Sequence, residues 1–185
     1  MSKMMAPVAT LLVLVAGMAM AADTKSGLQI GEAPGFFQVK DISGPNTGDT
    51  LCYRCAYGNR PVVTVFTRRM GDDVTQLVKQ IDQTVGKNQD SQMKALVVYL
   101  SDDPDSAEAK LKDTAKKLGL SANTPLTVFQ TSEGPDNYKI SKDAEITVLM
   151  WTNSKVKANH AFAKGATLSN DDIKKIVADT TKILK

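Results

Sequence analysis

The chain has 185 residues, of which 42% are hydrophobic and 23% are charged, as is ordinary for a globular protein. Its formal net charge of +3 is too small to indicate a nucleic-acid partner or a membrane surface as a partner. The length is sufficient for one domain with a substantial core, and we see no internal repeat and no second-domain boundary.

The first 21 residues have the pattern of a signal peptide. Lys3 supplies a positive charge, residues 6–20 are almost wholly apolar, and Ala19-Met20-Ala21 fits the small-x-small rule for cleavage. The apolar run is too short for a comfortable membrane span. We therefore expect cleavage near Ala21, export to the periplasm or out of the cell, and no stable membrane span in the mature chain.

Residues 22–35 are polar and rich in glycine and proline, which predicts an exposed lead-in to a folded domain over residues 36–185. Apolar and β-branched runs predict strands in this domain. We expect these strands at residues 36–42, 62–67, 93–100, 126–130 and 145–151.

Helical periodicity separates several of these strands. Apolar residues recur at helical spacing from Val74 to Val85. Asp103 and Pro104 form a helix start and Gly119 a helix end. Ser169 begins a third helix with a capping-box-like pattern.

The order of elements predicts a mixed sheet. The β-α-β-α part predicts parallel strands with right-handed crossovers. The strands at 126–130 and 145–151 are close enough in sequence to be antiparallel neighbours. We expect an α/β sandwich with helices on both faces of the sheet.

Cys52 and Cys55 are the two cysteines of the sequence, spaced as Cys-Tyr-Arg-Cys. One interpretation is a reactive dithiol, because Arg54 lies between the cysteines and could lower a thiol pKa. A second is a structural disulfide, which persists in an exported chain. A third is a metal or partner-dependent site, but two thiolates and His160 fall short of the four ligands of structural zinc. We predict no metal and no cofactor.

Residues 31–36 read Gly-Glu-Ala-Pro-Gly-Phe, and residues 58–66 read Gly-Asn-Arg-Pro-Val-Val-Thr-Val-Phe. These two motifs resemble the thioredoxin-like superfamily, especially its thioredoxin/peroxiredoxin branch. Thr124-Pro125, just before a strand, looks like the cis-proline position of the family, which implies a substrate-binding role for both residues. The resemblance implies a thioredoxin-like three-layer α/β/α sandwich with a mixed central sheet.

The cysteines depart from the family pattern. In the family the reactive cysteine follows the strand that corresponds to residues 62–67, whereas residues 67–71 here read Thr-Arg-Arg-Met-Gly. Cys55 precedes that strand. A direct path from Cys55 into the strand would leave the cysteines at the opposite pole from Pro125, whereas residues 56–61 could also fold back along the strand.

These observations predict an exported thiol–disulfide oxidoreductase whose catalytic residues are Cys52 and Cys55. By analogy with redox pairs, Cys52 is the attacking thiol and Cys55 the resolving thiol, and the partners are protein thiols or disulfides. The alternative is a non-enzymatic binding or scaffold domain of the same fold, with a structural Cys52–Cys55 disulfide.

Overall fold

The apolar runs of the sequence form one mixed sheet of seven strands. The computed structural model describes residues 24–184. Its helices and strands are β1 (Val39–Asp41), β2 (Thr50–Leu51), α1 (Tyr53–Tyr57), β3 (Val62–Thr67), α2 (Asp72–Lys87), β4 (Lys94–Leu100), α3 (Pro104–Leu118), β5 (Leu126–Phe129), η1 (Asp136–Tyr138), β6 (Ala144–Thr152), β7 (Lys155–Ala163), α4 (Asn170–Asp179) and η2 (Thr180–Lys182).

The strand order across the sheet is β2-β1-β5-β4-β3-β6-β7. β3, β4 and β5 are parallel neighbours, which confirms the predicted β-α-β-α arrangement. β6 runs antiparallel beside β3, and β1 antiparallel beside β5. The predicted pairing of the strands at 126–130 and 145–151 is therefore wrong. Residues 130–143, which include η1, are long enough to cross the sheet past β4 and β3.

β7 is a strand that the sequence analysis missed. It pairs with β6 through a hairpin whose turn residues Asn153 and Ser154 have φ values of 50° and 57°. Two successive positive φ values match the twist of a two-residue hairpin turn. Along β7, buried Val156 and Ala158 alternate with exposed Lys155 and Lys157. This alternation of exposed and buried residues is typical of a half-buried strand, and it was the sequence signal for β7.

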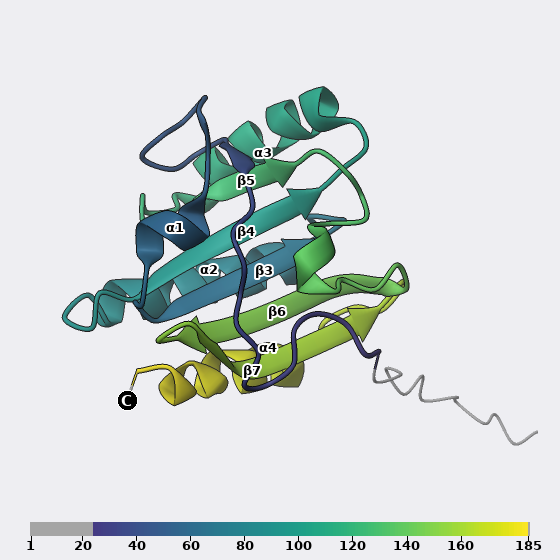
Figure 1. The fold of residues 1–185 in the computed structure, drawn as a ribbon. Helices are drawn as coiled ribbons and strands as arrows, with labels where there is room; N and C mark the ends of the chain where they lie inside the picture. The colour runs from purple at the N-terminus through teal and green to yellow at the C-terminus, as the bar shows by residue number, and fades with distance from the viewer. Residues whose placement is uncertain (1–23, 185) are drawn as a thin grey trace, which may run out of the picture.

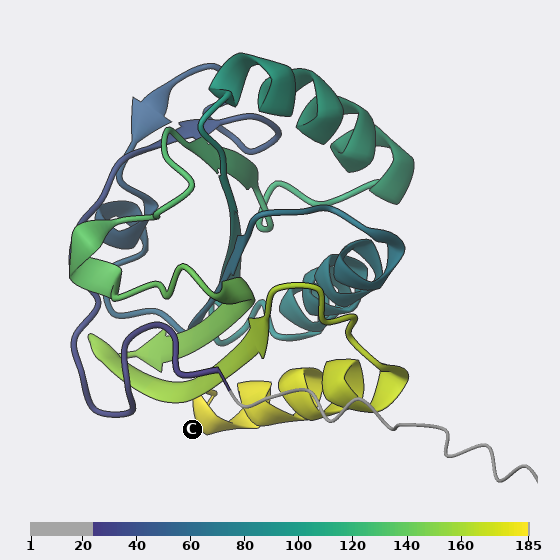
Figure 2. The same ribbon diagram turned by 90° about the vertical axis from the view of Figure 1, so that its right-hand side faces the viewer.

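The sheet has different covers on its two faces (Figure 1 and Figure 2). The three long helices α2, α3 and α4 pack on one face, where residues such as Ile81, Leu111 and Ile173 are buried. The other face is covered by α1, by η1 and by the N-terminal segment that crosses in front of the strands. The predicted three-layer arrangement is confirmed: the sheet lies between a layer of three long helices and a layer formed by two short helices and the N-terminal segment. No helix within residues 24–184 is long and apolar enough to cross a bilayer.

The N-terminal segment packs closely on the sheet. Ser26 and Leu28 are buried. The side-chain amide of Asn159 on β7 donates to the carbonyl oxygens of both residues, at 2.8 Å each. The expectation that the described part of residues 22–35 is exposed is therefore wrong for these positions, because the edge strands need an apolar and hydrogen-bonded cover. Residues 1–21, the predicted signal peptide, lie outside the described residues.

The predicted helix ends are confirmed. The side chain of Asp103 accepts a hydrogen bond from the Ser106 amide, and Gly119 ends α3 in the left-handed conformation with φ of 57°. Ser169 and Asp172 form a reciprocal capping box at the start of α4. Local signals of this kind depend on few residues, so the sequence is sufficient to place them.

β1 ends in a buried carboxylate. Asp41 accepts hydrogen bonds from the amides of Ser43, Gly44 and Asn46 at 3.2, 2.7 and 2.8 Å. It also accepts one from the hydroxyl of Tyr53 at 2.6 Å. A buried carboxylate costs free energy unless such donors compensate it. Asp41 therefore fixes the loop after β1 and the first residue of α1 to the sheet.

We expect Asp41→Asn to lower the free energy of unfolding by about 2–3 kcal/mol, because an amide presents its own donors to four groups that already donate. Urea unfolding of the variant and the parent protein would measure the loss. Asp49→Asn, an exposed position in the same loop, is the matched control and should change the value by less than about 0.5 kcal/mol. Equal stability of Asp41→Asn and the parent would contradict this account of the loop.

Candidate functional site

Cys52 and Cys55 are joined by a disulfide across the first turn of α1. Their Cα atoms are 5.3 Å apart, within the range that a disulfide spans. Cys52 is the N-cap residue of the helix, and the Cys55 amide donates a hydrogen bond to Cys52 Sγ at 3.1 Å. The two sulfurs are therefore not equivalent, since one of them already accepts a backbone hydrogen bond.

The two cysteines also differ in exposure. Cys55 is exposed to solvent, whereas Cys52 is partly buried where the chain passes from β2 into α1. Thiol–disulfide exchange needs a sulfur that an incoming thiolate can reach. The bond is thus accessible from solvent on the Cys55 side.

Two tyrosines attach α1 to the sheet. Tyr53 and Tyr57 are both buried, with ring centroids 5.2 Å apart. The Tyr57 hydroxyl donates to the carbonyl oxygen of Ala95 on β4 at 3.2 Å, and the Tyr53 hydroxyl donates to Asp41. Burial raises the pKa of both phenols, and the hydrogen bond to Asp41 raises that of Tyr53 further. Both tyrosines are consequently neutral anchors rather than acids or bases.

Arg54 lies between the cysteines in sequence, but its guanidinium is used elsewhere. It donates to the carbonyl oxygens of Pro34 and Gly58, both at 3.1 Å, and to the Ser154 hydroxyl at 2.8 Å. Its Cζ lies 4.8 Å from the ring centroid of Trp151, a cation–π distance. The suggestion that Arg54 activates a thiol has no support in this geometry. Arg54 instead ties α1 to the N-terminal segment and to the β6–β7 hairpin.

α1 lies over the half of the sheet in which β3 and β4 begin (Figure 1). Residues 58–61 lead directly from α1 into Val62, so the chain does not fold back along β3. Residues 68–71, the position of the family's reactive cysteine, follow the opposite end of β3. A strand of six residues spans about 20 Å. The disulfide and the family position are therefore separated by the length of β3.

An ion pair occupies the family position. Arg69 donates to both carboxylate oxygens of Asp73 at 2.6 Å each, and to the Ala166 carbonyl oxygen at 2.8 Å. A Cβ added to Gly71 would lie 2.7 Å from Arg69 Nη1, so the side chain passes close against that residue. The hydrogen bonds from Arg69, together with one from the Leu168 amide, lower the pKa of Asp73 to about 2. Charged side chains thus fill the start of α2.

Thr124 and Pro125 are buried where β5 begins. The Pro125 carbonyl oxygen accepts from the Val97 amide, and the Leu126 amide donates to Ser43 Oγ. The described residues contain no cis peptide bond, so Pro125 is trans. The Thr124 amide donates to the Ser121 carbonyl oxygen, so these three backbone groups are already paired within the protein. The predicted substrate-binding role of Thr124 and Pro125 stays a prediction without geometric support here.

The resemblance to the family predicts that Pro125 lies near the C-terminal end of β3, far from the cysteines, but Pro125 lies near α1 instead. A Cβ added to Gly44 would lie 2.5 Å from Pro125 Cβ and 2.7 Å from the Tyr53 hydroxyl. Pro125 and the tyrosine that follows Cys52 therefore approach the same glycine. The expectation that a direct chain path puts the cysteines and Pro125 at opposite poles is wrong, because Pro125 opens a strand that runs parallel to β3.

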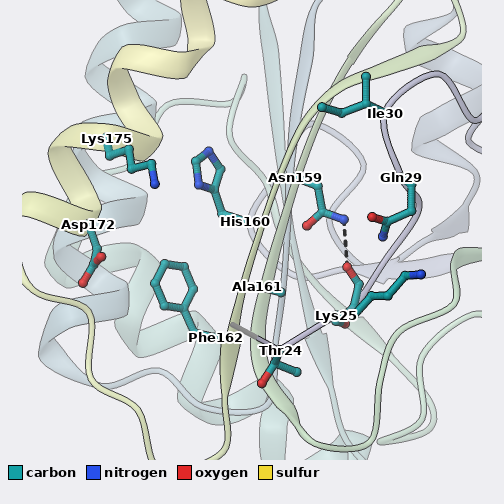
Figure 3. A pocket seen from close by; sticks show the side chains of 11 residues that line it. Thr24, Lys25, Gln29, Ile30, Asn159, His160, Ala161, Phe162, Asp172 and Lys175 are labelled. Atoms are coloured by element: carbon teal, nitrogen blue, oxygen red, sulfur yellow. Dashed lines mark hydrogen bonds between the residues drawn. The ribbon is translucent and has the colours of Figure 1, made fainter. Parts of the chain in front are cut away.

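A separate hollow of about 470 Å³ lies at the β7 edge of the sheet, between the N-terminal segment and α4 (Figure 3). His160 lies there with Nε2 3.0 Å from Asp179 Oδ2, although the two are not aligned for a hydrogen bond. Burial lowers the pKa of His160, and Asp179 opposes that effect without outweighing it. Neither Cys52 nor Cys55 lines this hollow. Within residues 24–184, no three His, Cys, Asp or Glu side chains gather as a metal site.

Sequence reasoning missed the residues that hold the cysteines in place. Asp41, Tyr53 and Tyr57 were not identified as a support for the disulfide. The spacing of Tyr53 and Tyr57, four residues apart, was a usable signal, because such residues share one face of a helix. The contact with Asp41 had no local signal, since it joins residues twelve positions apart.

No protein-family model matches the sequence, and the curated protein sequences gave no match. Solved structures do resemble this one. A protein assigned as a protein disulfide isomerase from Bacteroides thetaiotaomicron aligns at a TM-score of 0.64 and 14% identity, covering 87% of this chain and 94% of that one. A protein assigned as the thiol:disulfide interchange protein DsbE from Chlorobium tepidum aligns at 0.64 and 14%, covering 85% and 99%.

The bacterioferritin comigratory protein of Xanthomonas campestris, studied for its alkyl peroxide reduction activity, aligns at a TM-score of 0.55 and 12% identity. The alignment covers 80% of this chain and 92% of that one. Together with the mixed sheet and its helices, these likenesses show that the protein has a thioredoxin-like α/β fold. It carries its Cys-x-x-Cys disulfide before β3 instead of after it.

We expect Asp73→Asn to destabilise the protein at pH 7 by about 2 kcal/mol, because the folded-state pKa of Asp73 is lowered to about 2. A lowered folded-state pKa contributes stability above the unfolded-state pKa, near 4. That contribution is lost as the pH falls toward 2. The difference between variant and parent should therefore shrink steadily from pH 5 to pH 2.

Urea unfolding at several pH values would measure this dependence. Asp90→Asn, at an exposed position after α2, is the control and should follow the parent at every pH. A difference between Asp73→Asn and the parent that stays constant down to pH 2 would refute the lowered pKa of Asp73.

Proposed function

We propose that this protein is a thiol–disulfide oxidoreductase whose redox centre is the Cys52–Cys55 pair. The observation that carries the proposal is a disulfide that is open to solvent on its Cys55 side, on a thioredoxin-like fold. A disulfide stabilises a fold more when it closes a longer loop. This one joins residues three apart and closes a small ring at the surface.

The hydrogen bond at Cys52 also supports the proposal. When the disulfide is reduced, the Cys55 amide is positioned to donate to a thiolate at Cys52, 3.1 Å away. A hydrogen bond to the charged form of a group favours that form. Thiolate, not thiol, is the reactive species in exchange. The same local geometry therefore stabilises the Cys52 thiolate that is released when the bond is cleaved.

The partners we propose are protein thiols or disulfides, in line with the printed assignments of the structures from Bacteroides and Chlorobium. Thr124 and Pro125 have no part in this proposal, because both are buried beneath the loop after β1. The surface next to Cys55 is formed instead by exposed residues of α1 and the turn after it, including Ala56 and Asn59.

We also propose that the protein is exported to the periplasm or secreted. The signal-peptide pattern of residues 1–21 supports this, as does a disulfide, which persists in oxidising compartments. The likeness to a DsbE-assigned structure is compatible with it. Mass spectrometry of the protein from the producing cell tests the proposal, with a mature N-terminus near residue 22 as the expected result.

The second candidate is a binding or scaffold domain in which the disulfide is structural. The observation that favours it is the Arg69–Asp73 pair, which fills the position where related folds carry a reactive cysteine. A domain that has lost this site could retain the sheet and use the Cys52–Cys55 bond to fix α1. The two candidates differ in whether the bond exchanges with external thiols.

A redox titration of the purified protein decides between them. We expect the Cys52–Cys55 disulfide to be half-reduced at a potential above about −300 mV, where structural disulfides of secreted proteins stay oxidised. Thiol trapping followed by mass measurement counts the reduced cysteines. Trp151, the single tryptophan, packs under Arg54 of α1 and offers a fluorescence signal for the same transition. A pair that stays oxidised in excess dithiothreitol would count against the redox function.

Replacing both cysteines separates chemistry from stapling. We expect the Cys52→Ser, Cys55→Ser double variant to remain folded and to lose about 2 kcal/mol, the loop-closure value for a ring this small. It should have no activity toward a model disulfide that the parent protein reduces. Circular dichroism, urea unfolding and the exchange assay measure the three properties. A parent protein without exchange activity, combined with a stability loss in the variant, would identify the staple instead.

A further inference from the structure

The two sulfurs of the redox pair have unequal surroundings, and this inequality assigns their roles. The present inference rests on the proposed function. We propose that Cys55, the second cysteine, is the one that bonds to the substrate, and that Cys52 is the resolving cysteine. This order is the reverse of the one expected from analogy with redox pairs.

Access favours Cys55 as the sulfur under attack. Cys55 is exposed on the outer side of α1, whereas Cys52 is partly buried between β2 and the helix. Tyr53, the residue directly after Cys52, is buried and tied to Asp41, so the chain at Cys52 is held against the sheet. A protein thiol brings its own chain with it, and Ala56, which follows Cys55, is also exposed to solvent.

The leaving group points to the same assignment. When a thiolate attacks one sulfur of a disulfide, the other sulfur leaves as a thiolate, and a more stable leaving thiolate leaves faster. Cys52 Sγ accepts the hydrogen bond from the Cys55 amide at 3.1 Å. The charge that develops on Cys52 therefore meets a donor that is already in place. No corresponding donor to Cys55 Sγ is present among the described hydrogen bonds.

The exchange then balances in two steps. A substrate thiolate attacks Cys55 Sγ, a substrate–Cys55 disulfide forms, and the Cys52–Cys55 bond breaks with its electron pair on Cys52. The second thiolate of the substrate then attacks the substrate sulfur of the mixed disulfide and releases Cys55 as a thiolate. Two electrons pass from the substrate dithiol to the protein disulfide. In the reverse direction, Cys55 attacks a substrate disulfide and Cys52 resolves the intermediate.

The experiment uses the oxidised parent protein and reduced glutathione as the attacking thiol. The reaction is stopped after a short time with excess N-ethylmaleimide, which alkylates the released thiolate and prevents further exchange. Trypsin then separates the two cysteines, because it cleaves after Arg54. Cys52 falls on the peptide 41–54 and Cys55 on the peptide 55–68, since the Arg60–Pro61 bond resists cleavage.

We expect glutathione on peptide 55–68 and N-ethylmaleimide on peptide 41–54, with a ratio of about ten or more over the opposite pattern. Glutathione mainly on peptide 41–54, or equally on both peptides, would overturn the assignment and leave the redox function standing. A disulfide that releases no thiol to glutathione, and none to dithiothreitol, would remove the redox function and this assignment together.

The single-cysteine variants give a second measurement that does not depend on capturing a short-lived intermediate. Cys52→Ser retains the exposed sulfur and should accumulate a stable mixed disulfide with a substrate protein or with glutathione disulfide. Cys55→Ser should do so about tenfold more slowly. The opposite ranking, with both variants folded by circular dichroism, would contradict the assigned roles.

Discussion

The carboxylate of Asp41 is buried at the end of β1 and accepts hydrogen bonds from three backbone amides and from Tyr53. This interaction closes the loop after β1 and sets where α1 begins. Gly44 completes the arrangement, because any side chain there would collide with Pro125 and the Tyr53 hydroxyl. The position of the Cys52–Cys55 disulfide therefore depends on the contact between Tyr53, the residue after Cys52, and Asp41 of the sheet.

In this protein the short helix α1, which precedes β3, carries the cysteines, whereas a long core helix such as α2 does not. α2 begins directly after the central strand β3, but its start is filled by Arg69 and Asp73. α1 has five residues and depends on the contacts of Tyr53, Tyr57 and Arg54 and on the disulfide, since an isolated helix of that length does not persist in water. The fold thus places the disulfide away from the start of α2, and side chains of α1 hold it against the sheet.

The sequence predicted what depends on local pattern. β3 was placed at its observed bounds, and the caps at Asp103 and Ser169 were identified, because few residues determine them. It failed where pairing is decided over long separations. β5 and β6 were expected to be neighbours, yet two other strands lie between them. The cysteine pair was visible from the sequence, whereas its support by Asp41 joins separate elements and had no local signal.

Arg54 illustrates why residue type alone was insufficient at the site. Its place between two cysteines suggested an electrostatic effect on a thiol, but its guanidinium reaches Pro34, Gly58 and Ser154 instead. A charge that is satisfied by three acceptors and an aromatic face has little left to offer a neighbouring sulfur. The nearest hydrogen-bond donor, the Cys55 amide, then determines which of the two cysteines leaves as the thiolate. That donor belongs to the backbone, so it is set by the fold of α1 and not by the identity of the residues between the cysteines.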